Sequence, residues 1–209
     1  MSIENVSKRL EELHRLHWSY DYRNNFERGE TYLREWFATG NLKNKRFFAV
    51  TLTPQAEVIH AKGIWGSIDA RERFVNGLWK NLKHPLNRQI HNNYQRHPEF
   101  VLRDLVFIEH RPSNPNSEQL ENPHLHGTIA VDKSRVDRLY DVLTPVNADA
   151  YYLNLKALHR AENGIQDVLV KPITTKENLT LWTGYATKQQ EGNKYEYQQE
   201  CRLKRNQSI

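Results

Sequence analysis

The stretch from residue 101 to residue 131 constrains the fold more than any other part of the chain. Residues 101–109 (VLRDLVFIE) and 124–131 (HLHGTIAV) are rich in the branched residues that favour strands. Residues 111–123 between them are rich in Pro, Asn and Ser, which indicates a loop rather than a helix. Parallel neighbours need a long crossover, usually helical, so we expect these two strands to form an antiparallel hairpin at the centre of a sheet.

Helical and strand patterns alternate along the rest of the chain. Helical periodicity or capping residues predict helices within 1–40 and at 67–82, 136–143 and 175–190, and strands at 47–54 and 167–173. The early strands are joined by connections too short or too irregular for parallel crossovers. We therefore expect an α+β fold, with helices packed on one face of a mostly antiparallel sheet and an extra N-terminal helical segment.

The length of 209 residues fits one domain with appendages. We expect a helical extension over 1–42, the main domain over 43–190 and a polar tail over 191–209. Cys201 is the only cysteine, which excludes a disulfide framework and a cysteine-based zinc site. No apolar run reaches membrane-spanning length and the N-terminus lacks a signal-peptide pattern, so we expect a cytoplasmic protein without a membrane partner.

Two histidines one residue apart begin the strand expected at 124–131. In a strand, alternate side chains share a face, so His124 and His126 point the same way and form a natural pair of metal ligands. In the expected hairpin Glu109 lies near His124, and its carboxylate is a candidate third ligand. His110 is the competing candidate, although it falls on the opposite face unless the strand bulges.

The helix expected near the C-terminus carries a second reactive group. Tyr185 and Lys188 are three residues apart and therefore share a helix face, with Trp182 on the same side as a candidate anchor. Tyrosines in helices are most often core residues, and a lysine on the same face makes simple burial less favourable. A phenol can attack phosphorus, and an ammonium group can stabilise the developing charge.

Three segments, FFAVTLTP, NPHLHGTI and GYATK, occur in an order that resembles the three motifs of the HUH endonucleases. The similarity is closest to rolling-circle replication initiators (Rep proteins) of plasmids and single-stranded DNA phages. Their first motif is similar to the F-x-x-T-L-T strand containing Thr51 and Thr53. Their second is His-hydrophobe-His, and their third is Tyr-x-x-Lys. The resemblance implies a ferredoxin-like or RRM-like antiparallel core and favours Glu109 as the third ligand.

The resemblance also implies an activity. With Mg²⁺ or Mn²⁺ bound, such enzymes nick single-stranded DNA, or an extruded origin hairpin, through a 5′-phosphotyrosine intermediate, and so initiate rolling-circle DNA replication. The chain has no phosphate-binding loop of the Walker type, so a host helicase would unwind the duplex. The net charge of +5 fits a polyanionic partner. The expected DNA contacts are Lys43, Lys45, Arg46, Thr51, Thr53 and Trp182.

Other functions use related residues. A non-catalytic origin-binding regulator, or a transposase or relaxase on the same scaffold, would keep part of this set, although the Tyr-x-x-Lys spacing favours replication. The sequence from His126 to Thr128 also fits the His-x-Thr element of two-histidine RNA phosphoesterases. That chemistry needs a second such element, which the chain lacks.

Overall fold

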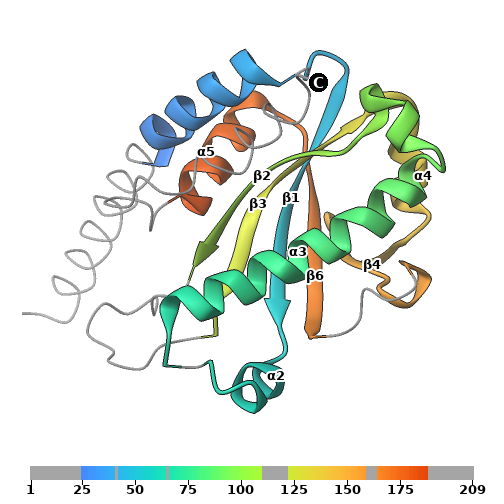
Figure 1. Cartoon of the computed structure of the whole chain (residues 1–209). Coiled ribbons are helices and arrows are strands. Elements are labelled where there is room, and N and C mark those ends of the chain that lie inside the picture. The colour runs from blue at the N-terminus through green and yellow to red at the C-terminus, as the bar shows by residue number, and fades with distance from the viewer. Residues whose placement is uncertain (1–24, 41, 65, 110–121, 159–163, 188–209) are drawn as a thin grey trace, which may run out of the picture.

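A six-stranded antiparallel sheet forms the centre of the protein in the computed structural model, which describes residues 25–40, 42–64, 66–109, 122–158 and 164–187 (Figure 1). The strand order is β2-β3-β1-β6-β5-β4. The strands are β1 (Lys45–Pro54), β2 (Arg103–Glu109), β3 (His124–Asp132), β4 (Leu143–Asn147), β5 (Ala150–Leu153) and β6 (Ile165–Ile173). The α+β class and the antiparallel pairing are as expected. The β2-β3 hairpin, however, lies at one edge of the sheet rather than at its centre.

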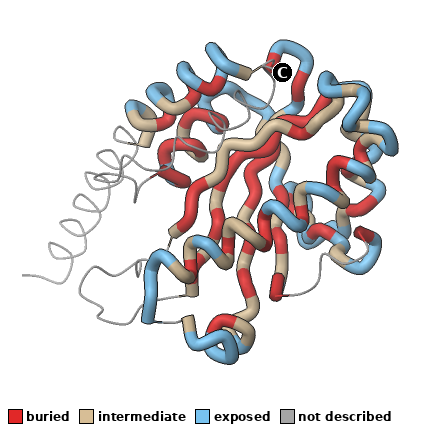
Figure 2. The backbone as a smooth tube through the Cα atoms, in the orientation of Figure 1, coloured by how far each residue is buried: buried red, intermediate tan, exposed pale blue. Residues whose placement is uncertain are grey.

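Helices cover both faces of this sheet, whereas the sequence led us to expect them on one face. One face packs on the long helix α3 (Ile68–Ile90), which runs across the sheet in Figure 1. The other face packs on α5 (Lys176–Ala186) and on a helix over residues 25–39, which lies beside α5. The central strands contain runs of consecutive buried residues, so both of their faces need apolar cover (Figure 2).

The main core lies between α3 and the sheet. The buried apolar residues of α3 recur at three- and four-residue steps, and those of the strands alternate along each strand. They include Val75, Trp79, Leu82 and Leu86 from α3, and Phe48, Leu52, Ile108, Leu125, Ile129 and Val168 from the sheet. This face is therefore closed to substrate over the middle of the sheet.

The ends of α3 show how local and tertiary effects combine. The predicted cap is confirmed, because Ser67 Oγ accepts a hydrogen bond from the backbone N–H of Ala70 at 3.3 Å. The helix then continues past the predicted end at residue 82, although it contains Pro85. Burial of Leu86 and Ile90 extends the apolar stripe by two turns, and this offsets the hydrogen bond that proline cannot make.

Several short elements differ from the expectation. The helix α4 (Val136–Tyr140) is shorter than predicted, while α2 (Ala56–Ala61), β4 and β5 were not predicted. Pro145 lies within β4, which a sheet tolerates because β4 is an edge strand. Four single-turn 3₁₀ helices complete the described part of the chain, at Tyr94–Arg96, Pro98–Phe100, Lys133–Arg135 and Lys156–Leu158.

The helix over residues 25–39 packs on the sheet and on α5 through its apolar side chains. It contributes Leu33 and Trp36 to a second core, which also contains Ala130 of β3 and Leu179 of α5. Residues 1–24 and 188–209, which include the predicted first helix and the polar tail, lie outside the described residues. Among the described helices, none combines the length and the apolar character needed to cross a membrane.

Candidate functional site

The predicted site residues of three strands meet at one end of the sheet. In the register, Glu109 of β2 pairs with His124 of β3, and Thr51 of β1 pairs with His126 of β3. Directly opposed residues in an antiparallel ladder point to the same face. All four side chains therefore lie on the face that α5 covers, and the two histidines share this face as their alternation predicted.

The imidazole of His126 is held at both of its nitrogens. Its Nε2 lies 2.9 Å from Oε2 of Glu109, and its Nδ1 lies 3.0 Å from the hydroxyl oxygen of Thr51. The side chains of His126 and Glu109 are only 12% and 11% exposed, so water competes weakly for these contacts. Because a carboxylate only accepts, Nε2 of His126 donates to Glu109, and in a neutral imidazole Nδ1 then accepts from the Thr51 hydroxyl.

The donor set at this end of the sheet suits a divalent cation. The rings of His124 and His126 are nearly parallel, with centroids 6.2 Å apart and planes at 15°. Imidazole and carboxylate donors together bind first-row metals, and two histidines with one carboxylate leave positions open for oxygen ligands. In the conformation described, Glu109 and His126 contact each other directly. Within the described ranges, no three His, Cys, Asp or Glu side chains are already grouped as a metal site.

To hold a divalent cation through Nε2, His126 would give up the proton on that nitrogen. Nδ1 would then carry the proton and donate it to Thr51 Oγ1, because a hydroxyl can accept as well as donate. Such a second hydrogen bond from a metal-bound histidine is the usual arrangement in proteins. The alternative third ligand, His110, lies outside the described residues.

Helix α5 places two aromatic side chains over His126. Thr175 caps this helix as predicted, accepting a hydrogen bond from the Asn178 N–H at 3.1 Å. The Tyr185 ring meets the His126 ring edge to face, at 5.6 Å between centroids and 73° between planes. The phenol is not a core residue, because Tyr185 is 38% exposed. The Tyr185 side chain is therefore accessible from solvent while its ring contacts the imidazole of His126.

Trp182 fixes the position of Tyr185. Its indole Nε1–H donates to the backbone carbonyl of Gly127 at 2.7 Å, and its ring stacks on that of Tyr185 at 5.5 Å and 24°. The tryptophan thus joins α5 to the strand that carries both histidines, which agrees with its expected role as an anchor. Lys188, predicted to share the tyrosine's face, lies outside the described residues.

Gly127 is a site residue that the sequence reasoning missed. A Cβ atom at this position would approach the Leu105 carbonyl oxygen of the neighbouring strand to well under 3.0 Å, a distance that real Cβ atoms do not reach. Glycine therefore allows β2 and β3 to lie close together where Glu109 reaches His126. The available signal was a glycine inside a strand pattern, which indicates a close approach of backbone.

The basic residues expected beside the substrate lie at the other end of β1. Lys45 is the first residue of this strand and Thr51 lies six positions later, which corresponds to roughly 20 Å at about 3.3 Å per residue. Lys45 is also buried, with Nζ 3.7 Å from Oδ2 of Asp132, and burial lowers the pKa of its ammonium group. Lys43 and Arg46 are exposed at the same distant end.

These three residues were expected to contact the DNA because they directly precede the first motif. Strand β1 extends from these residues toward the site. They therefore lie at its far end, although they adjoin the first motif in sequence. Thr53, by contrast, is two residues beyond Thr51 and shares its face of the sheet.

Comparison of the chain with known protein families, with curated proteins and with solved structures finds no match.

Proposed function

We propose that this protein is a metal-dependent, site-specific endonuclease and strand transferase for single-stranded DNA, of the HUH kind, which initiates rolling-circle replication. One observation carries the proposal. An exposed phenol, Tyr185, packs on an imidazole, His126, whose two nitrogens are engaged by Glu109 and Thr51. These four residues come from three separate strands and a helix, and they include one residue from each of the three sequence motifs.

The chain's own residues supply the nucleophile and its alignment. Glu109, His124 and His126 would hold the divalent cation, which supplies Lewis-acid polarisation of the scissile phosphate when bound. Thr51 keeps the His126 ring in one orientation, and Trp182 holds the phenol above that ring. A phenol that keeps its proton is a weak nucleophile, so the attack of Tyr185 depends on stabilisation of the developing charge.

The proposed reaction exchanges one phosphate ester for another. The Tyr185 oxygen forms a bond to phosphorus and the phenolic proton is lost, while the bond to the 3′ oxygen breaks and that oxygen gains a proton. The DNA on the 3′ side of the nick stays joined to tyrosine through its 5′ phosphate. Because the number of ester bonds is unchanged, attack by a free 3′-OH reverses the reaction and allows strand transfer.

The polarity of the adduct tests this proposal. We would incubate the full chain and Mn²⁺ with a random-sequence pool of single-stranded oligonucleotides carrying different fluorophores at the 5′ and 3′ ends. On a denaturing gel, the 3′ fluorophore should move with the protein and the 5′ fluorophore should be released. Tyr185→Phe should abolish the adduct while keeping DNA binding, whereas the control Tyr94→Phe should behave as the wild type.

Two kinds of outcome would contradict the proposal. An adduct that persists in Tyr185→Phe, or one that retains the 5′ label, would contradict the assignment of the nucleophile. Wild-type protein that binds single-stranded DNA but forms no adduct with any metal would instead favour the non-catalytic, origin-binding alternative.

A further inference from the structure

We propose that the open half of the sheet face beside α5 binds the single-stranded DNA that adjoins the scissile phosphate, with Tyr152 as a stacking platform and Lys171 as a phosphate contact. This inference rests on the proposed function and extends it. It assigns the substrate a path over strands β6, β5 and β4, away from the edge of the sheet that carries Glu109.

The strand register connects Tyr152 to the candidate site. His126 of β3 pairs with Thr51 of β1, Thr51 pairs with Leu169 of β6, and Leu169 pairs with Tyr152 of β5. These four residues form one row across the sheet, and all of them point to the same face. Neighbouring strands lie about 4.8 Å apart, so Tyr152 is roughly 14 Å from His126 along this row.

Among the described residues, no helix has its main packing on this part of the sheet face. Helix α5 packs mainly on β3, with further contacts to β1, β2 and β6. Beyond it, Tyr152 is 45% exposed, its partner Thr144 on β4 is exposed and Leu169 is half-buried. The preceding residue, Tyr151, points to the opposite face, where its ring packs edge to face on Tyr140 at 5.4 Å. Tyr152 thus presents an aromatic surface to solvent where its neighbour has a packing partner.

Charged residues on either side of the row determine on which side the phosphates of the DNA would lie. Lys171 follows Leu169 by two residues on β6, shares its face and is exposed. Within the part of the chain that the structure describes, no ion pair of Lys171 is found. Asp167, two residues before Leu169, shares this face and pairs with Thr53. A phosphate is therefore attracted on the Lys171 side of the row and repelled on the Asp167 side.

Single-stranded DNA fits this combination of groups. Its unpaired bases can stack on an exposed aromatic ring regardless of their identity, and its phosphates need cationic contacts along one side. The bases of a duplex are stacked on each other and cannot reach Tyr152. We therefore place the sugar–phosphate chain along the Lys171 side, with a base over the Tyr152 ring.

Fluorescence anisotropy with a labelled oligothymidylate, without added metal so that cleavage is avoided, tests the inference. Stacking on an aromatic side chain is worth enough that Tyr152→Ala should weaken binding about 5- to 100-fold. Tyr152→Phe should bind within twofold of the wild type, because the ring and not the hydroxyl makes the contact. Lys171→Ala should reduce the slope of log affinity against log salt by about 0.7.

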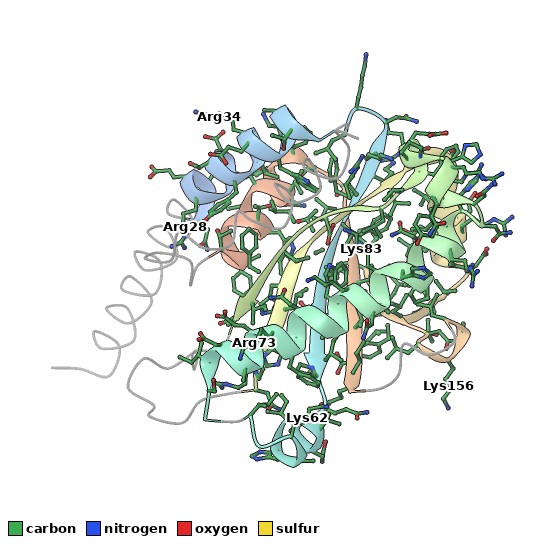
Figure 3. The ribbon with its side chains drawn as sticks, viewed as in Figure 1. Arg28, Arg34, Lys62, Arg73, Lys83 and Lys156 are labelled. Atoms are coloured by element: carbon green, nitrogen blue, oxygen red, sulfur yellow. The ribbon has the colours of Figure 1, made fainter. Side chains whose placement is uncertain are left out.

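A control variant separates this path from general charge effects. Lys156 is exposed and extends away from the sheet in Figure 3, so Lys156→Ala should leave the salt slope unchanged. Wild-type binding that persists undiminished in Tyr152→Ala and Lys171→Ala would overturn the inference and leave the proposed function standing. A wild-type protein that neither binds single-stranded DNA nor forms an adduct would overturn both. A change of oligomeric state in these variants would overturn the inference in favour of an interface between copies of the chain.

Discussion

At the scale of single residues, the hydroxyl of Thr51 holds the imidazole ring of His126 in one orientation. The hydroxyl lies 3.0 Å from Nδ1 and can donate to this nitrogen or accept from it, and its contact keeps Nε2 directed toward Glu109. Valine has nearly the same shape as threonine but cannot form this hydrogen bond. Replacing Thr51 by valine therefore removes the hydrogen bond while it keeps the packing of the side chain.

We expect Thr51→Val to slow adduct formation about 10- to 100-fold, because second hydrogen bonds to metal-binding histidines have effects of that size. Thr51→Ser keeps the hydroxyl and should retain most of the activity. Single-turnover gel assays over a range of Mn²⁺ concentrations measure both the rate and the apparent metal affinity. Equal rates in the valine and serine variants would show that Thr51 contributes only packing.

At the scale of elements, two glycines let the helix over residues 25–39 approach α5 backbone to backbone. A Cβ atom on Gly29 would lie well under 3.0 Å from the Thr180 carbonyl oxygen, and one on Gly184 would meet the Asn25 carbonyl in the same way. Gly184 directly precedes Tyr185. The contact therefore connects the position of the N-terminal helix to that of the phenol.

We expect Gly29→Ala to destabilise the protein, although alanine is the better helix former by about 1 kcal/mol. Overpacking costs about 1–3 kcal/mol, and here the obstacle is backbone that cannot rotate aside. Gly77 of α3 is the matched control, since a Cβ atom there meets no other atom within 4 Å. Thermal unfolding should show a lower Tm for Gly29→Ala and a Tm about 2–4 °C higher for Gly77→Ala. Shifts of the same sign in both variants would contradict the close contact.

At the scale of the whole molecule, a buried ion pair joins the start of β1 to the end of β3, far from the candidate site. Lys45 lies 3.7 Å from Asp132, and both residues are 7% exposed. Burial of the Asp132 carboxyl acts to raise its pKa, but hydrogen bonds from Ser134 and the charge of Lys45 outweigh burial and hold the pKa below the ordinary 3.8.

A carboxyl group whose pKa is lowered by folding stabilises the folded protein at pH values above its unfolded pKa. That contribution is lost as the pH falls below about 3.9 toward the lower pKa of the folded state. We therefore expect Asp132→Asn to reduce the free energy of unfolding at neutral pH, also because the buried Lys45 loses its charged partner and keeps only the backbone carbonyl of Glu99. Urea denaturation should show that the difference from wild type shrinks below pH 4. The exposed Asp149, changed to Asn, controls for the altered net charge, and a difference that stays constant with pH would contradict this account.

The sequence by itself determined the features that depend on near neighbours in the chain. The alternation of a strand placed His124 and His126 on one face, and the caps at Ser67 and Thr175 marked where two helices begin. The absence of a helical crossover between the two strands at 101–109 and 124–131 predicted their antiparallel pairing. These features follow from local geometry, which spacing and residue type set directly.

Only the tertiary structure decided which distant segments meet. It placed β1 between β3 and β6, so that Thr51 contacts His126, and it laid α5 over the histidines with Trp182 bonded to Gly127. It also buried Lys45, which the sequence had placed beside the substrate. Strand order and helix packing depend on how the whole chain buries its apolar surface, a sum over contacts that no local pattern contains.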